Sequence, residues 1–192
     1  MQAEELTAEF GIAGILDFVE TEHGLVKAAI SLDGMAGELY LQGAQLTAWQ
    51  PPGERPVLFT SPNSAFAPGR AIRCGIPIIF PWFGPSRHVL AAPQHGFART
   101  APWHLDKVET AGRESLTLTF SLGDGDVGSP FWPEPFRVIY TVVFAQTLSC
   151  LRFTRAGIAA SSRNAGSVYL VFKGPPSKCR FKGAKTESVA HL

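Results

Sequence analysis

The residues best suited to chemistry lie in two neighbouring segments of this 192-residue chain. The first, residues 69–84, sets isolated arginines, Arg73 among them, between glycine, proline and apolar residues, and the second contains Gln94, His95 and Arg99. An arginine offers a rigid fork of donors for phosphate or carboxylate, and an amide both donates to and accepts from a hydroxyl. A histidine beside glycine can approach a ligand closely and titrates near neutral pH. Together these residues predict a pocket for an anionic, hydroxylated small molecule.

The elements that must position these residues are short apolar segments separated by turn signals, a pattern typical of an all-β domain. Residues 115–120 alternate in polarity as a half-buried strand does. Residues 138–144 are rich in β-branched and aromatic side chains, which indicates a central strand. The expected strands are 25–32, 35–41, 45–50, 57–60, 76–80, 103–109, 115–122 and 136–147.

Gly123-Asp124-Gly125-Asp126 superficially suggests a calcium loop. It lacks the ladder of ligands and the closing glutamate of an EF-hand, so we expect a solvated hairpin turn there and no metal.

Composition and length fit one globular domain, because 45% of the residues are hydrophobic and 17% are charged. The acidic N-terminus lacks the basic and apolar regions of a secretory signal, and no apolar run approaches the length of a membrane helix. Cys74, Cys150 and Cys179 are odd in number and match neither a disulfide framework nor a zinc site. We therefore expect a cytoplasmic protein without a membrane partner.

The charge of the chain changes sign near Cys150. Nine basic residues face fifteen acidic ones up to that point, a net charge of −6, and eight basic residues face Glu187 alone after it, a net charge of +7. Strand-like periodicity is lost at the same place, apart from one expected strand at 167–172. We therefore divide the chain into a β-sandwich portion, 1–155, and an atypical basic tail, 156–192, expected to be irregular or disordered.

Several motifs together carry a family resemblance, which spans approximately residues 23–153. They are Gln-Gly-Ala-Gln-Leu-Thr-Ala-Trp at 42–49, Pro-Val-Leu-Phe at 56–59, Ala-Ile-Arg-Cys-Gly-Ile-Pro at 71–77, Phe-Pro-Trp-Phe-Gly at 80–84, and Gln-His-Gly-Phe-Ala-Arg at 94–99 with Trp103. Their order and spacing resemble the hexose-6-phosphate 1-epimerase branch of the aldose 1-epimerase (mutarotase) superfamily. The resemblance implies a large antiparallel β-sandwich, the galactose mutarotase-like supersandwich, with a sugar site on a concave sheet face.

The resemblance also implies an isomerase of carbohydrate metabolism that interconverts the α and β anomers of glucose 6-phosphate or a related aldose phosphate, without metal or organic cofactor. A base removes the proton of the anomeric hydroxyl while an acid protonates the ring oxygen. By resemblance, Arg73 and Arg99 form the phosphate-binding end, Gln94 contacts substrate, and His95 is a supporting catalytic histidine that holds the sugar near its ring.

Each of these residues also has a plain structural alternative. Taken singly, Arg73 and Arg99 read as surface ion-pair residues and His95 as a structural histidine, and the motif context is what favours the site. Trp82 and Phe83 are candidate walls of the pocket. Cys74 stands where the family usually has glycine.

Two family motifs are missing from this sequence. The principal acid, a histidine in a His-Thr-Tyr-Phe-like segment, and the later glutamate base are both absent, because beyond Arg155 only His191 and Glu187 occur, in no family context. We therefore expect the N-terminal part of an epimerase, a sandwich incomplete at its C-terminus, with weak or absent turnover. A non-catalytic sugar-phosphate-binding protein and a non-functional fragment are the alternatives.

Two further kinds of partner can be weighed from the sequence. Exposed strand edges in an incomplete sandwich invite self-association. The basic stretch 173–185 suggests nucleic acid by charge only, and we do not expect that partner because no RNA-binding motif accompanies it.

Overall fold

The computed structural model of the chain describes residues 2–61, 63–73, 75–86, 91–127, 131–132, 135–145, 148–156 and 167–173. Within these residues it contains nine strands and two short helices. In chain order they are α1 (Ala3–Phe10), β1 (Leu16–Glu20), β2 (Val26–Leu32), β3 (Met35–Tyr40), β4 (Gln45–Gln50), β5 (His104–Thr110), β6 (Ser115–Gly123), α2 (Asp124–Val127), β7 (Arg137–Ala145), β8 (Leu148–Ala156) and β9 (Ser167–Lys173).

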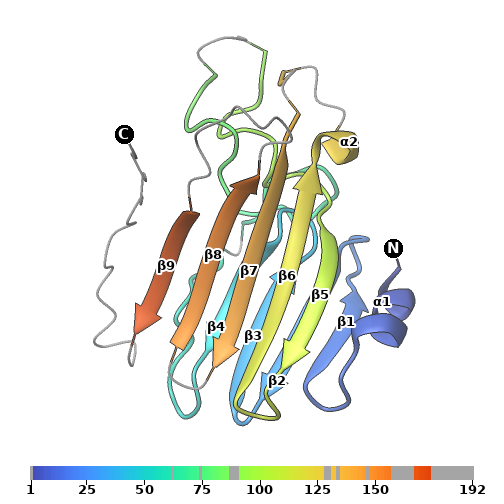
Figure 1. Cartoon of the computed structure of the whole chain (residues 1–192), viewed down its shortest axis with the longest axis vertical. Coiled ribbons are helices and arrows are strands. Elements are labelled where there is room, and N and C mark those ends of the chain that lie inside the picture. Colours follow the sequence, from blue (N-terminus) through green and yellow to red (C-terminus); the bar gives the residue numbers. More distant parts are fainter. Residues whose placement is uncertain are drawn as a thin grey trace.

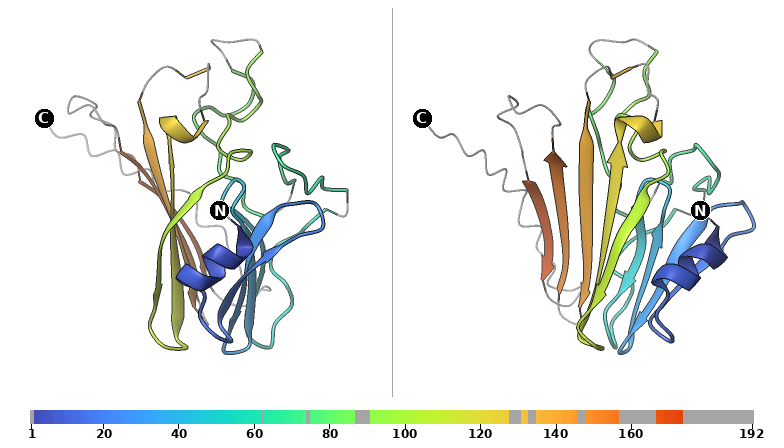
Figure 2. Two further views of the ribbon diagram at one scale, coloured as in Figure 1. Left: turned by 90° about the vertical axis from the view of Figure 1, so that its right-hand side faces the viewer. Right: turned by 45° about the vertical axis from the view of Figure 1, so that its right-hand side comes forward.

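The strands form two antiparallel sheets that face each other, so the predicted all-β sandwich is confirmed (Figures 1 and 2). One sheet has the order β1-β2-β3-β4 and the other the order β5-β6-β7-β8-β9. Within each sheet, every strand therefore pairs with the next strand in sequence, in the antiparallel sense. Figure 2 shows α1 alongside the four-stranded sheet, against β1.

The core lies between the two sheets and follows from alternation along the strands. On β7, Val138, Tyr140, Val142 and Phe144 are buried while their neighbours are partly exposed, as a period of two requires. The sheets come close at Gly37 of β3, because a Cβ added there would lie 2.5 Å from Cε1 of Phe144. The alternating patterns read from the sequence thus place one face of each sheet inside.

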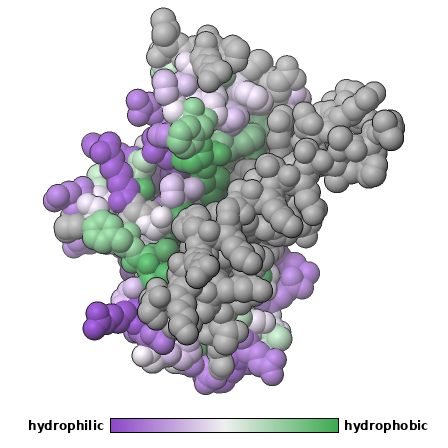
Figure 3. Space-filling model, turned by 90° about the vertical axis from the view of Figure 1, so that its left-hand side faces the viewer, coloured by the Kyte–Doolittle hydropathy of each residue, from purple (hydrophilic) through white to green (hydrophobic). Residues whose placement is uncertain are grey.

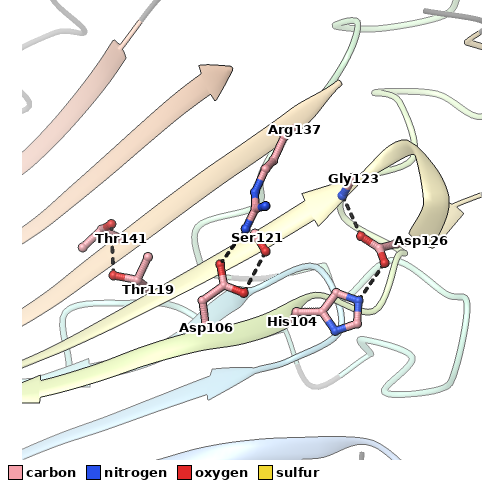
Figure 4. A network of polar contacts seen from close by, with 8 residues as sticks. All are labelled: His104, Asp106, Thr119, Ser121, Gly123, Asp126, Arg137 and Thr141. Atoms are coloured by element: carbon pink, nitrogen blue, oxygen red, sulfur yellow. Dashed lines mark hydrogen bonds and ion pairs between the residues drawn. The ribbon is translucent and has the colours of Figure 1, made fainter. Parts of the chain in front are cut away.

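Polar side chains occupy the opposite face of the five-stranded sheet (Figure 4). The Ser121 hydroxyl donates to Asp106 Oδ1 at 2.9 Å, and Arg137 Nη2 lies 3.6 Å from Asp106 Oδ2. Near the end of β6, Asp126 of α2 accepts from the Gly123 amide at 2.6 Å and lies 2.7 Å from His104 Nε2. These contacts join β5, β6 and β7 and attach α2 to the sheet.

Two expected strands, 57–60 and 76–80, were wrong. Both lie in the long connection between β4 and β5, where single bridges replace a ladder: Leu46 with Ile76, and Phe80 with Gly96. Ile78 and Phe80 are nevertheless buried in the core. A loop that supplies core side chains gives an apolar run that cannot be told from a strand by composition. Figure 1 shows this connection, in teal and green, extending beyond the strand ends.

The expected hairpin turn at 123–126 was also wrong, because residues 124–127 form the single helical turn α2. The Asp126 side chain accepts the Gly123 amide and the Asp124 side chain accepts the Phe136 amide at 3.4 Å, so both aspartates satisfy backbone donors near the helix start. The connection from β6 to β7 is longer than a tight hairpin as a result.

Several element boundaries differ from those expected. Helix α1 and strands β1 and β8 had not been predicted. Strand β8 runs through the place where strand-like periodicity was expected to end, so that expectation was wrong. Strand β7 ends at Ala145, with 146–147 outside the described residues. Strand β9 occupies the stretch where one strand was expected in the basic tail, and it pairs with β8. The remainder of 157–192 lies outside the described residues.

Candidate functional site

The loop that carries Arg73 is held by the side chain of Gln42. Gln42 is only 8% exposed, and its Nε2 donates to the carbonyls of Ala67 at 3.2 Å and Arg70 at 2.8 Å. Its Oε1 accepts the Gly69 amide at 2.7 Å. One buried amide therefore satisfies three backbone groups of a loop that has no ladder of its own, which fixes the loop against the end of β3.

The turn between β3 and β4, which contains Gln42, also packs against the segment that carries Arg99. The Gly43 amide donates to the Ala101 carbonyl at 2.7 Å, and the Trp103 amide donates to the Leu41 carbonyl at 3.1 Å. A Cβ on Gly43 would lie 2.6 Å from the Arg99 carbonyl oxygen, so the backbones meet closely here. The connection between β3 and β4 thus positions both arginine-bearing segments.

Residues on both sides of Arg73 are fixed. Its own amide donates to the Ser64 hydroxyl at 2.7 Å. Gly75 has φ +57°, and a Cβ there would lie 1.9 Å from the Leu46 carbonyl oxygen, while the Ile76 amide donates to that same oxygen at 2.9 Å. The exposed Arg73 side chain thus projects from a backbone anchored to β4. Cys74 lies outside the described residues.

His95 is oriented by two hydrogen bonds with Gly84. The Gly84 amide donates to His95 Nδ1 at 3.0 Å, and the His95 amide donates to the Gly84 carbonyl at 2.7 Å. Because Nδ1 accepts a hydrogen bond, the proton of the neutral ring lies on Nε2. No residue in the described ranges pairs with Nε2, so it can donate to a ligand oxygen. His95 itself has φ +64°, in the left-handed region that non-glycine residues rarely adopt.

The guanidinium of Arg99 is partly buried and feels the charge of Arg73. Its Nη2 donates to the Gln94 carbonyl at 2.7 Å, and its buried Nε has no hydrogen-bond partner in the described part of the chain. Burial, and then the positive charge of Arg73, lower the pKa of Arg99. Within the described ranges no carboxylate pairs with either arginine. Two neighbouring cations without an anion favour an anionic ligand between them.

In the structure, Gln94 also contributes its main chain to the site, which the sequence had not indicated. Its backbone carbonyl holds Arg99, whereas its side chain is exposed. The amide is therefore free to meet a ligand hydroxyl, and the main chain links Gln94 directly to the arginine.

The two expected walls of the pocket differ from each other. Trp82 stabilises the loop structure. Its Nε1 donates to the Pro93 carbonyl at 3.0 Å, and its ring packs edge to face on that of Phe97, with ring centroids 6.1 Å apart. The Phe83 ring is 82% exposed and lies against His95, with ring centroids 4.9 Å apart.

Sequence reasoning missed the part played by Gln42. It lies in one of the quoted motifs, but a glutamine at a strand end gives no local signal that it will bond a loop 25 or more residues away. Its combination of burial and three backbone partners becomes visible only in the fold.

Two general properties of the described residues bear on the class of site. No three His, Cys, Asp or Glu side chains gather there as a metal centre would require. Neither of the described helices has the length and hydrophobicity needed to cross a membrane. His191 and Glu187, at the end of the tail, lie outside the described residues.

Comparison with known proteins gives consistent matches. The aldose 1-epimerase family model matches residues 29–161. Over 124 residues the chain is 40% identical to the "Putative glucose-6-phosphate 1-epimerase" of Escherichia coli, covering 65% of this chain and 38% of the relative. It is 38% identical over 128 residues to the protein of the same name from the plant Cenchrus ciliaris, covering 63% and 37% of the two chains.

A solved structure has the same fold. The crystal structure titled "putative mutarotase (YeaD)" from Salmonella typhimurium matches with a TM-score of 0.73 and 28% identity, over 85% of this chain and 53% of that one. The chain spans less than two-fifths of the length of these curated relatives. On the family match, which covers more than half of its residues, the chain belongs to the aldose 1-epimerase family.

Proposed function

We propose that the chain binds a hexose 6-phosphate and forms the phosphate-binding portion of a hexose-6-phosphate 1-epimerase site. The observation that carries the proposal is the pair Arg73 and Arg99, in which burial and mutual repulsion lower the pKa of Arg99. A phosphate dianion between the two would relieve the repulsion and accept paired hydrogen bonds. The names of the curated relatives support glucose 6-phosphate as the ligand.

The proposed chemistry is anomer exchange. A base removes the proton of the anomeric hydroxyl, an acid protonates the ring oxygen, the ring opens, the C1–C2 bond turns, and closure gives the other anomer. In this scheme His95 donates from Nε2 to an oxygen near the sugar ring, and its bonds to Gly84 hold the tautomer that can do so. Gln94 contacts a hydroxyl, and Arg73 and Arg99 bind the phosphate.

The described site offers a donor but no carboxylate base. We therefore propose that this chain binds the sugar phosphate with weak or absent turnover, and that it acts as a non-catalytic sugar-phosphate-binding protein if turnover is absent. A coupled assay of anomer exchange, run beside a binding titration, separates the two: binding without acceleration supports a binding protein.

Binding itself is tested by calorimetric titration with glucose 6-phosphate. Arg73→Ala and Arg99→Ala should each weaken binding about tenfold or more, because each removes charge-assisted hydrogen bonds to the phosphate. Arg113→Ala, which removes an exposed arginine from the turn between β5 and β6, is the matched control and should leave the affinity unchanged. Equal affinity in all three variants and the wild type would refute the assignment.

Three further inferences concern the cellular compartment, the division of the chain and its self-association. The odd, scattered cysteines favour the cytoplasm. The change in charge near Cys150 supports a family-like unit over 1–155 and a distinct tail over 156–192.

Self-association is the third inference. Strands β5 and β9 are the edges of the five-stranded sheet, and such an edge strand can pair with a second copy. From the β9 side, apolar residues are visible among hydrophilic ones (Figure 3). Light scattering over a range of protein concentrations tests this inference, and a constant monomer mass would contradict it.

A further inference from the structure

Phe83 is exposed to an unusual degree for a phenylalanine. Its side chain is 82% exposed, and the large hydrophobic residues that share this property among the described ones are Phe59 at 76% and Val19 at 42%. A single exposed apolar side chain is ordinary on a protein surface. Phe83 stands apart from the other two because its ring lies against His95 of the candidate site.

The backbone around Phe83 is held firmly although its ring is exposed. On one side, Trp82 Nε1 donates to the Pro93 carbonyl, and on the other, Gly84 exchanges two hydrogen bonds with His95. Both anchors lie in the segment that also contains Gln94. The position of the Phe83 ring is therefore set by the same segment that sets the candidate site.

The ring of Phe83 meets the ring of His95 in a T-shaped arrangement, with an interplanar angle of 73°. This contact covers only a small part of the phenyl group, since most of its surface stays exposed. An apolar surface thus lies immediately beside the imidazole, whose Nε2 is available as a donor.

We propose that Phe83 is a specificity-determining residue that stacks on the C–H face of the hexose ring while His95 donates to one of its oxygens. The inference rests on the proposed function. A pyranose ring presents several C–H groups on one face, and an aromatic ring, negative on its face, attracts them and removes apolar surface from water. A linear phosphate ester lacks such a face. Phe83 therefore favours cyclic sugar phosphates, whereas the arginines recognise only the phosphate.

The experiment compares two ligands on the intact chain, glucose 6-phosphate and glycerol 3-phosphate, by calorimetric titration. Phe83→Leu keeps an apolar side chain but loses the flat ring, and it should weaken glucose 6-phosphate binding about fivefold to tenfold while leaving glycerol 3-phosphate unchanged. Phe83→Trp keeps an aromatic face and should retain most of the affinity for glucose 6-phosphate. Phe59→Leu, at a phenylalanine of similar exposure, is the control and should change neither affinity.

The outcomes separate this inference from the proposed function. If the wild type binds glucose 6-phosphate in an Arg73-dependent manner and Phe83→Leu binds it equally well, stacking is refuted and the proposed function stands. If Phe83→Leu weakens both ligands equally, Phe83 supports the phosphate end and the stacking role is also refuted. If the wild type binds neither ligand, the proposed function fails, and this inference fails with it.

Discussion

At the scale of single residues, the site is built by side chains that satisfy backbone groups of loops. Gln42 bonds three groups of the loop that leads to Arg73, Gly84 fixes the His95 ring, and the Gln94 carbonyl fixes Arg99. Loops lack the repeating ladder of a strand, so such single contacts decide where their functional side chains lie.

Gln42→Leu should therefore weaken both folding and binding. The substitution leaves the carbonyls of Ala67 and Arg70 and the Gly69 amide without their partner, at a cost of about 2 kcal/mol in the free energy of unfolding. Affinity for glucose 6-phosphate should fall as well, because the loop carrying Arg73 loses its anchor. Urea unfolding and calorimetric titration measure the two effects.

Gln50→Leu is the control for this change, because within the described residues the Gln50 side chain, at the end of β4, makes one exposed hydrogen bond, to the Glu54 carbonyl at 3.0 Å. It should cost less than about 0.5 kcal/mol and leave binding intact. If Gln42→Leu behaved like Gln50→Leu, Gln42 would not be the anchor described.

At the scale of elements, close approaches of backbone position the loops on the sheets. Gly96 has φ +71°, and a Cβ added there would lie 1.9 Å from the Phe80 carbonyl oxygen. Phe80 and Gly96 form an isolated β-bridge, which brings their backbones this close together. Only glycine both adopts the angle and leaves the space.

Gly96→Ala should consequently destabilise the fold by about 3 kcal/mol or more, since it combines an unfavourable backbone angle with a clash against backbone atoms. Gly112→Ala shares the positive φ, at +57°, but has open space around its Cβ, so it should cost only about 1 kcal/mol. Thermal unfolding of the two variants gives the comparison. Similar losses for both would show that the close approach at Gly96 does not constrain the loop.

The attachment of α2 to the sheet should depend on pH. Burial works against ionisation of Asp126, but hydrogen bonds from Gly123 and His104 and the charges of His104 and Arg137 outweigh it, so the pKa of Asp126 lies below its usual value. Its stabilising effect is then complete above the unfolded-state pKa of about 3.9 and is lost as the pH falls through the lower folded-state value.

Asp126→Asn should thus be less stable than wild type by about 1 kcal/mol at most at pH 7, because the pair is partly exposed and screened. The difference should shrink as the pH falls below about 4. Glu114→Gln, at an exposed carboxylate without a side-chain partner in the described ranges, is the control and should show little difference at either pH. A stability difference for Asp126→Asn that stayed constant from pH 7 to pH 3 would contradict the assignment.

At the scale of the whole molecule, the sequence predicts the sandwich better than it predicts the connections. Alternation along 115–120 and the β-branched run at 138–144 indicated β6 and β7, because one face of each strand is buried. The apolar runs at 57–60 and 76–80 gave the same signal, yet they lie in a loop from which side chains such as Val57, Ile78 and Phe80 pack on the core. A buried loop segment and a strand in a hydrogen-bonded ladder give the same apolar pattern, so local composition cannot distinguish them.

For the candidate site too, the sequence predicted some features and not others. The residue types at Arg73, His95 and Arg99 predicted an anion-binding pocket, and the family resemblance supplied their roles. The contacts that orient them, such as Gln42 with the loop of Arg73, join residues far apart in sequence and depend on how the two sheets bring the loops together. Phe83 was expected to wall the pocket, and its exposure beside His95 could be known only from the fold.

The central claim is that Arg73 and Arg99 act together on one phosphate group, and a double-mutant cycle on glucose 6-phosphate binding tests it most directly. Dissociation constants are measured by calorimetry for the wild type, Arg73→Ala, Arg99→Ala and the double variant. If both arginines share one phosphate, the double variant should bind only slightly less tightly than either single variant, with a coupling energy of about 1 kcal/mol or more. Fully additive losses, or no loss in either single variant, would contradict a shared phosphate site.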